Sequence, residues 1–149
     1  MLSTEIRRAT DADLKELAVL FDQYRIFYKQ TSDVEKAENF LKDRMQNKES
    51  VVFVAVTGSV FTGFVQLYPI FSSVRMQRMW LLNDLFVSSN FRGNGISRML
   101  IGKSKELCRE TGACGILLET ATDNMPGNRL YPSENFVLQE SQNFYFWQA

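Results

Sequence analysis

The spacing of hydrophobic residues predicts two helices near the start of the chain. In both segments apolar residues recur every three or four positions, as on the buried face of an amphipathic helix. Each segment follows a capping-box signal, Thr10 with Asp13 and Ser32 with Glu35. The apolar stripes are Leu14, Leu17, Ala18 and Phe21 in the first helix, and Val34, Ala37, Leu41 and Met45 in the second.

Runs of consecutive apolar residues predict the strands. A short strand over 5–7 precedes the first helix, and three antiparallel strands follow over 51–56, 60–68 and 79–87, with a loop over 71–78. A helix is expected over 96–111, with Ile96, Met99, Leu100 and Leu107 facing inward and Gly112 at its end. A buried strand over 115–120, a short helix over 127–133, and strands over 136–139 and 144–147 complete the pattern. The order βααβββαβαββ predicts an α/β (α+β) fold with a mixed, mostly antiparallel sheet, in a single domain over residues 1–149.

Composition narrows the classes of function. The 149 residues include 17 basic and 17 acidic side chains, and this balance argues against a nucleic-acid partner. The sequence contains no histidine, which excludes histidine-based catalytic triads and histidine-bound metals. Cys108 and Cys114 lack further partners for a metal site, so no metal is expected. We find neither a signal peptide in residues 1–10 nor an apolar stretch of membrane-spanning length, and we therefore expect a cytoplasmic protein with no membrane partner.

A glycine-rich turn, Arg92-Gly93-Asn94-Gly95-Ile96-Ser97, separates the strand over 79–87 from the next helix. The first amides of a helix have no internal partners, and the helix dipole adds positive potential there. Such a turn can therefore bind a phosphate group, with Arg92 and Arg98 adding charge. The pattern is also compatible with a plain tight turn. It lacks the Gly-Lys-Ser/Thr of a P-loop and the third glycine of a dinucleotide fingerprint.

Two motifs in this sequence resemble those of the GNAT superfamily of N-acetyltransferases. Leu85-Phe86-Val87 followed by Arg92-Gly93-Asn94-Gly95-Ile96 is similar to its coenzyme A motif, Arg/Gln-x-x-Gly-x-Gly/Ala, with Ser97 in place of Gly or Ala. The segment from Asn124 to Tyr131, followed by Asn135-Phe136, is similar to Asn-x-x-Ala-x-x-x-Tyr…Gly-Phe. It departs from that pattern at Gly127 and at Asn135, a residue type that tolerates a left-handed backbone.

The resemblance implies the GNAT fold, acetyl-CoA as co-substrate and acetyl transfer to a small-molecule or protein amine. Segments 24–28, 68–74 and 80–87 are similar to the branch of small polyamine and histone acetyltransferases. Polyamine enzymes of that branch carry a Glu-Asp pair where this chain has Asn83-Asp84. The residues implied in cofactor binding are Leu85, Phe86, Val87, Arg92, Gly93, Asn94, Gly95, Ile96, Ser97, Arg98, Asn124, Asn128 and Tyr131.

Catalytic roles are expected for Asp84 and Tyr131. An acceptor amine with a pKa of about 10.4 must lose a proton before it attacks. Asp84, directly or through water, is the candidate base, although it could instead only brace its strand. The resemblance places Tyr131 beside the sulfur, where it could protonate the thiolate, and implies that a backbone amide from 85–87 stabilises the carbonyl oxygen.

The acceptor is expected to bind between the first two helices and a loop over 69–74. Tyr24, Phe27 and Tyr28 would supply aromatic walls, although such a stripe more often belongs to the core. Asn83 is a further residue expected to contact the acceptor. Asp22 and Asp33 could attract a polyamine. The aromatic run over 144–147 could close the core or form a homodimer interface, and we favour the dimer. Two alternative functions remain open: an acyl-CoA-binding module that acts through a protein partner, and a dinucleotide-binding domain.

Overall fold

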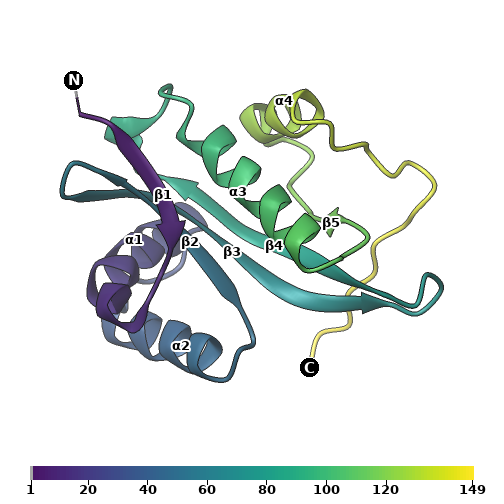
Figure 1. The fold of residues 1–149 in the computed structure, drawn as a ribbon, viewed down its shortest axis with the longest axis horizontal. Helices are drawn as coiled ribbons and strands as arrows, with labels where there is room; N and C mark the ends of the chain where they lie inside the picture. Colours follow the sequence, from purple (N-terminus) through teal and green to yellow (C-terminus); the bar gives the residue numbers. More distant parts are fainter. Residues whose placement is uncertain (1) are drawn as a thin grey trace. The chain divides into compact units, whose positions relative to one another are not determined.

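A computed structural model describes residues 2–149, which form two compact units divided between Glu119 and Thr120. The larger unit contains a five-stranded sheet in the order β1-β2-β3-β4-β5 (Figure 1). Its strands are β1 Thr4–Arg8, β2 Val51–Thr57, β3 Val60–Ser72, β4 Gln77–Val87 and β5 Ile116–Leu117. The first four strands are antiparallel neighbours, and β5 runs parallel to β4. The predicted mixed, mostly antiparallel sheet is confirmed.

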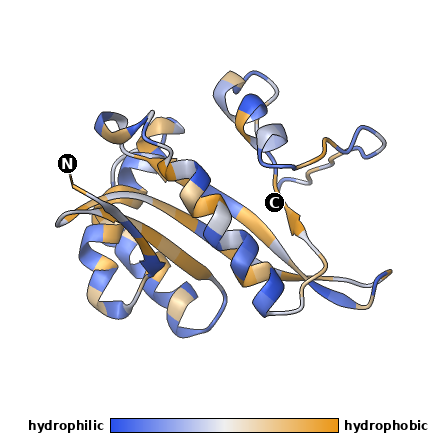
Figure 2. Ribbon diagram, turned by 45° about the horizontal axis from the view of Figure 1, so that its top comes forward, coloured by the Kyte–Doolittle hydropathy of each residue, from blue (hydrophilic) through white to orange (hydrophobic). Residues whose placement is uncertain are grey.

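Helices cover both faces of this sheet (Figure 1). One face carries α1 Leu14–Phe27 and α2 Val34–Gln46, and the other carries α3 Ile96–Glu110. The four predicted apolar positions of α1 are all buried, as are Ala37 and Leu41 of α2, whereas Val34 at the start of α2 is 38% exposed. Figure 2 shows hydrophobic residues concentrated on the strands and polar residues distributed along the helices. The helical spacing therefore identified the buried face of α1 correctly and that of α2 only in part.

The start of α1 is held by the predicted capping box. Asp13 is the last residue of a 3₁₀ turn over Asp11–Asp13, and its Oδ2 accepts hydrogen bonds from the Thr10 amide (2.8 Å) and from Arg7 Nη1 (2.8 Å). The bond to the Arg7 guanidinium is the main reason that the pKa of Asp13 is lowered to about 2. The carboxylate thus remains ionised and keeps β1 joined to the first helix.

The connection between α1 and α2 differs from the prediction. Asp33, and not Ser32, caps α2, because its Oδ1 accepts the amide of Lys36 (3.0 Å). The Ser32 hydroxyl instead donates to Oδ2 of Asp22 (2.7 Å), while Oδ1 of Asp22 accepts the Asp33 amide (2.8 Å). Asp22 is 4% exposed. The expectation that Asp22 attracts a polyamine is therefore wrong, since this carboxylate is buried and braces the loop.

The β3–β4 hairpin is longer than the sequence predicted. Half of the expected loop over 71–78 is strand, with a turn left over 73–76, and Pro69 lies inside β3 opposite Trp80. Pairing with β2 ends at Val51 and Leu67, so Pro69 has a strand neighbour on one side only. Proline is compatible with such an edge because no ladder partner needs its missing N–H. The acceptor site consequently cannot be bounded by a loop over 69–74.

Helix α3 lies close to the sheet where Gly63 of β3 has no side chain. A Cβ atom at Gly63 would lie 2.9 Å from the carbonyl oxygen of Phe86 and 3.3 Å from side-chain atoms of Ile96 and Leu100. Ile96, Leu100 and Leu107 are buried as predicted, together with Ile101 and Ser104. Met99 is 41% exposed, so its predicted inward orientation is wrong. Gly112 has a left-handed φ of 64° just after the helix, as a helix-ending glycine requires.

The end of the chain has less regular structure than predicted. The strand expected over 115–120 is reduced to the two residues of β5, and Leu117 is 42% exposed. The second unit contains α4 Met125–Ser133, two residues longer at its start than predicted. Segments 136–139 and 144–147 are not strands, and the side chains over 144–147 are 69–85% exposed. None of the helices within residues 2–149 has the length and apolar character needed to cross a membrane.

Candidate active site

The glycine-rich turn joins the end of β4 to the start of α3. Gly93 and Gly95 have left-handed φ angles of 79° and 76°. A Cβ atom at either position would meet no atom within 4 Å. The glycines are thus required by the backbone conformation and not by crowding. Residues 92–95 are exposed, so the space in front of this turn is open to a ligand.

The amides of the first turn of α3 can bind an anion. Met99 makes the first main-chain bond of the helix, donating its N–H to the carbonyl of Gly95 (3.1 Å). The amides of residues 96–98 precede it and have no carbonyl of the helix to reach. The helix dipole adds positive potential at the same end. Because Ile96 is 3% exposed and anchors the turn in the core, these amides are held in place.

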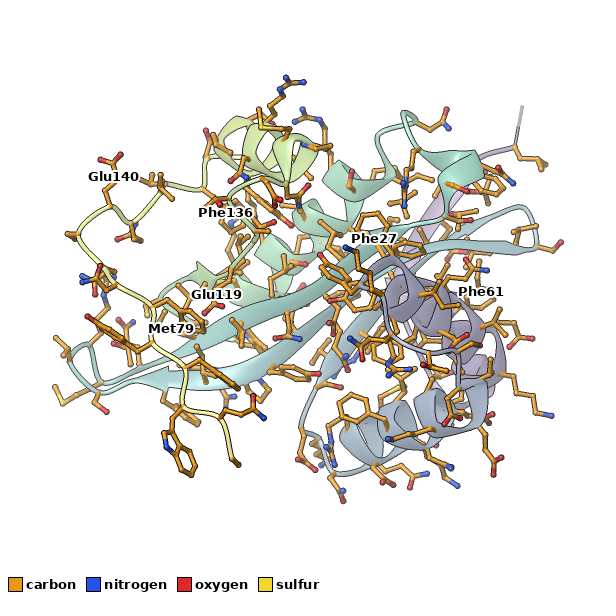
Figure 3. All side chains as sticks on the ribbon, turned by 180° about the vertical axis from the view of Figure 1, so that it is seen from behind. Phe27, Phe61, Met79, Glu119, Phe136 and Glu140 are labelled. Carbon is orange, nitrogen blue, oxygen red and sulfur yellow. The ribbon has the colours of Figure 1, made fainter. Side chains whose placement is uncertain are left out.

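The side chain of Arg92 braces the turn. Its Nε donates to the carbonyl of Val87 at the end of β4 (2.9 Å). Its guanidinium lies over two aromatic rings, 5.6 Å from the centroid of Phe27 and 5.5 Å from that of Phe86. Phe27 projects from the last turn of α1 (Figure 3). Arg92 therefore links the glycine-rich turn to β4 and to the aromatic end of α1, where the sequence predicts the acceptor site.

One edge of β4 lacks a strand neighbour beside the turn. Parallel pairing with β5 involves only Trp80 and Leu81. From Leu82 to Val87, β4 pairs with β3 alone. The β3–β4 register also shifts, so that Gln66 faces Asp84 and Leu67 faces Leu82, which leaves Asn83 as a bulge. Among residues 2–149, the backbone over 85–87 thus has no strand partner on this side, where only the Val87 carbonyl is already bonded, to Arg92 Nε. Pairing of an extended ligand with this edge remains a prediction.

Asp84 is buried beside this open edge, with 4% of its surface exposed. Gln66 Nε2 donates to its Oδ2 (2.7 Å), Asn83 Nδ2 donates to its Oδ1 (3.0 Å), and the Tyr24 hydroxyl is also hydrogen-bonded to it. Burial raises the pKa of Asp84, while the hydrogen bonds from Gln66, Tyr24 and Asn83 act in the opposite direction. The structure thus holds a carboxylate with increased proton affinity, which is a property of a general base.

Two tyrosines share this environment and remain protonated at neutral pH. Burial, followed by the charge of Asp84, raises the pKa of Tyr68 to about 12. The same causes raise the pKa of Tyr24 above its ordinary value. The sequence did not indicate that Tyr68 and Gln66 lie near Asp84. Gln66 could have been noticed as a polar residue between Val65 and Leu67 in an otherwise apolar strand.

The three predicted aromatic residues have different environments. Tyr24 is half-buried, and its ring centroid lies 5.7 Å from that of Phe64 and 6.1 Å from that of Phe86, so the ring is part of the core. Phe27 and Tyr28 are 60% and 53% exposed and contact each other edge to face at 5.3 Å. Only these two offer open aromatic surface to an acceptor, whereas Tyr24 offers its hydroxyl to Asp84.

In the second unit, two asparagines of the second motif organise α4. Asn124 caps the helix: its Oδ1 accepts the Gly127 amide (3.3 Å), and its Nδ2 donates to Thr120 Oγ1 (2.8 Å). A Cβ atom at Gly127 would lie 2.5 Å from Nδ2 of Asn124, which explains why glycine replaces the usual alanine. Asn128 Nδ2 donates to the carbonyls of Ala121 (2.9 Å) and Asn124 (2.8 Å). Their cofactor contacts remain predictions.

The end of α4 has the turn that the motif predicts. Asn135 has a φ of 67°, so asparagine adopts the left-handed conformation for which the family uses glycine. The Phe136 amide then donates to the carbonyl of Tyr131 (3.0 Å), and the two rings meet at 5.9 Å. Tyr131 is therefore held in a defined local conformation. Its position beside a cofactor sulfur remains a prediction.

Comparisons with known proteins identify similar chains. The model of the acetyltransferase (GNAT) family matches residues 14–136. An uncharacterised N-acetyltransferase of Bacillus subtilis, YhfO, is 43% identical over 131 residues, which cover 88% of each chain. The crystal structure of a probable acetyltransferase superposes with a TM-score of 0.93 and 35% identity, covering 97% of each chain. An aminoglycoside N-acetyltransferase in complex with CoA has a TM-score of 0.84 at 18% identity, covering 100% of this chain and 97% of that one, and shares the fold.

Proposed function

This chain belongs to the acetyltransferase (GNAT) family, and we propose on that premise that it transfers the acetyl group of acetyl-CoA directly to a primary amine in a ternary complex. It is an N-acetyltransferase, and the family uses acetyl-CoA as the donor. The observation that supports direct transfer is the position of Asp84, a buried carboxylate beside the open edge of β4 and immediately before the segment over 85–87. A base and an edge for the pantetheine chain thus lie on one strand.

Asp84 is the proposed base. The acetyl thioester supplies an electrophilic carbonyl carbon. An ammonium group is not a nucleophile, so the acceptor must first give a proton to a base. Asp84 is ionised when it takes this proton, directly or through water, and its raised proton affinity favours the transfer. A backbone amide of residues 85–87 would donate to the carbonyl oxygen as negative charge develops on it.

Tyr131 is the proposed acid. A thiolate leaves more readily when a donor protonates its sulfur, and a tyrosine hydroxyl remains protonated at neutral pH. The family motif, which Asn124, Tyr131 and Phe136 match, supports this role. The left-handed turn at Asn135 and the contact between the rings of Tyr131 and Phe136 keep the local geometry that the motif needs.

The turn over 92–98 is the proposed diphosphate site. It supplies two left-handed glycines with open space in front of them and the N-terminal end of α3, where the helix dipole is positive. These features support diphosphate binding at this turn. The adjoining backbone over 85–87 would pair with the pantetheine amides.

Substituting Gly95→Val is expected to weaken CoA binding by about tenfold. A β-branched residue disfavours a φ of 76° by about 1–2 kcal/mol, so the turn of the free variant should relax to another conformation. Restoring the binding conformation then costs part of the binding free energy, and 1.4 kcal/mol corresponds to a factor of ten in Kd. Isothermal titration calorimetry with CoA measures the effect. The matched control is Gly102→Ala, an interior position of α3 where a Cβ atom meets nothing within 4 Å, and it should leave the Kd unchanged. Equal affinity of the Gly95 variant and the wild type would contradict this site.

A panel of amines tests the proposed reaction. Release of free CoA thiol from acetyl-CoA should require an acceptor, and at least one primary amine should accelerate it well above hydrolysis. The panel includes a polyamine, an aminoglycoside, an amino acid and a lysine peptide. We propose a small primary amine of the kind used by the polyamine and histone branch, which segments 24–28, 68–74 and 80–87 resemble. Binding of acetyl-CoA without turnover of any amine would refute the reaction and favour a binding module.

We further propose that the chain forms a homodimer through its aromatic C-terminal segment. Phe144, Tyr145, Phe146 and Trp147 are exposed, and such an apolar surface tends to be covered by a partner. The paired substitution Phe144→Ser and Phe146→Ser should therefore convert a dimer into a monomer of 17.2 kDa, as measured by light scattering after size exclusion. Val74→Ser, at a 96% exposed apolar position of the β3–β4 turn, should leave the mass unchanged. A wild type that is monomeric at assay concentration would contradict this interface.

A further inference from the structure

Gln66 is a fully buried polar residue that the reaction as described does not use. It lies in β3 directly opposite Asp84 and has 0% of its surface exposed. Its Nε2 donates to Oδ2 of Asp84 at 2.7 Å. Its Oε1 is buried and has no hydrogen-bond partner among residues 2–149. A buried acceptor without a partner is costly, so this arrangement needs a compensating reason.

The compensating reason is the charge on Asp84. An ionised carboxylate only accepts hydrogen bonds, and an amide has one donating and one accepting end. Turning the amide over would bring Oε1 against Oδ2, so that two acceptors would face each other. The carboxylate therefore determines the orientation of Gln66, and Oε1 is left without a partner as a consequence. The observed orientation is the one that an ionised Asp84 requires.

The other groups around Asp84 are neutral polar side chains at pH 7. Tyr24 faces Asp84 from α1, Asn83 from its own strand, and Tyr68 from β3. Arg44 of α2 interacts electrostatically with Tyr68. Without an ion pair of its own, Asp84 depends on hydrogen-bond donors to stay charged inside the protein. Among these donors Gln66 has the largest opposing effect on the raised pKa of Asp84, and its bond to the carboxylate (2.7 Å) is shorter than that of Asn83 (3.0 Å).

We propose that Gln66 is a positioning residue for acetyl transfer, whose amide holds Asp84 ionised and aligned so that the carboxylate can take the proton of the acceptor amine. This inference rests on the proposed role of Asp84 as the base. Gln66 itself does not touch the reacting atoms. It acts by setting the pH at which Asp84 is available and the direction of its carboxylate oxygens.

Gln66→Met tests the inference because methionine has a similar length and no N–H donor. Loss of a hydrogen bond to a charged group should raise the pKa of Asp84 by about one unit, which equals a tenfold change in its proton affinity. The acid limb of the kcat–pH profile should move upward by the same amount. At a pH below the limb kcat should fall about tenfold, and above it kcat should return close to that of the wild type.

Thr62→Val is the matched control. Thr62 is also fully buried in β3, but its hydroxyl donates to the carbonyl of Ala55 (3.2 Å) and does not reach Asp84. This variant should lose stability without moving the acid limb. Gln66→Leu provides a second variant if Gln66→Met does not fold, and thermal melting of all variants shows which ones are native.

The titration of Asp84 is also followed by carbon NMR of its carboxyl group in the protein without substrate, which separates this inference from the proposed reaction. An upward shift in both the NMR titration and the kcat limb supports the inference. An unchanged NMR titration, or a kcat reduced by one factor at every pH, overturns it. If the NMR titration moves but the kcat limb does not, Asp84 is not the base, and Gln66 is no positioning residue for transfer.

Discussion

Replacing Asp84→Asn is expected to lower kcat for acetyl transfer by about 10²–10⁴-fold, the usual effect of removing a general base. The variant should still fold, because Gln66 can turn its amide over and present its free Oε1 to the new side-chain amide. Steady-state kinetics and CoA titration together check this result. The Kd for CoA should change little, because the phosphate turn over 92–98 does not involve the carboxylate. A variant with near wild-type kcat would contradict the role of base.

The pH dependence of kcat gives a second test of Asp84 as the base. Burial raises the pKa of Asp84 above its ordinary value, and only the ionised form can accept a proton. The kcat of the wild type should therefore fall as the pH is lowered through that raised pKa, at a higher pH than an exposed aspartate would give. The same limb should be absent from the profile of Asp84→Asn.

The free energy of unfolding should depend on pH in the opposite direction to kcat. A group whose pKa is raised on folding contributes stability below its unfolded pKa, and this contribution is lost as the pH rises through the folded pKa. The burial of Asp84 thus makes the free energy of unfolding lower at neutral and alkaline pH than at acidic pH. Thermal unfolding of Asp84→Asn should show a smaller loss of stability between acidic and alkaline pH than that of the wild type.

Tyr131→Phe is expected to slow acetyl transfer by about 10²-fold while leaving CoA affinity nearly unchanged, because it removes only the proton donor. The ring contact with Phe136 and the backbone bond between the two residues do not depend on the hydroxyl, so α4 should keep its structure. Single-turnover measurements with acetyl-CoA isolate the chemical step. Tyr145→Phe, at an 84% exposed position, is the matched control. Unchanged single-turnover rates in the Tyr131 variant would rule out this acid.

The active-site residues differ in how far the sequence could predict them. The turn over 92–97 was predictable because its signals are local: a strand, glycines where φ is positive, and a helix start. Asp84 was identified from its place on the strand leading to this turn. Its environment was not predictable, because Gln66, Tyr24 and Tyr68 come from other elements and meet Asp84 only through strand register and helix packing.

The C-terminal segments show why the strand preference of individual residues does not always predict a strand. Residues 136–139 and 144–147 have the β-branched and aromatic composition of strands, yet they are not paired. A helix satisfies its hydrogen bonds within itself, whereas a strand exists only beside another strand. For the same reason β5 is limited to the two residues that pair with β4.

The sequence by itself determined the element order as far as α4, the buried face of α1 and the glycine-rich turn before α3, because hydrophobic period, helix caps and glycine dihedrals act over a few residues. Only the tertiary structure decided where β3 and β4 pair, where the bulge at Asn83 falls, and which side chains surround Asp84. These features depend on contacts between residues distant in the chain. Their energies come from burial and register, which no local pattern specifies.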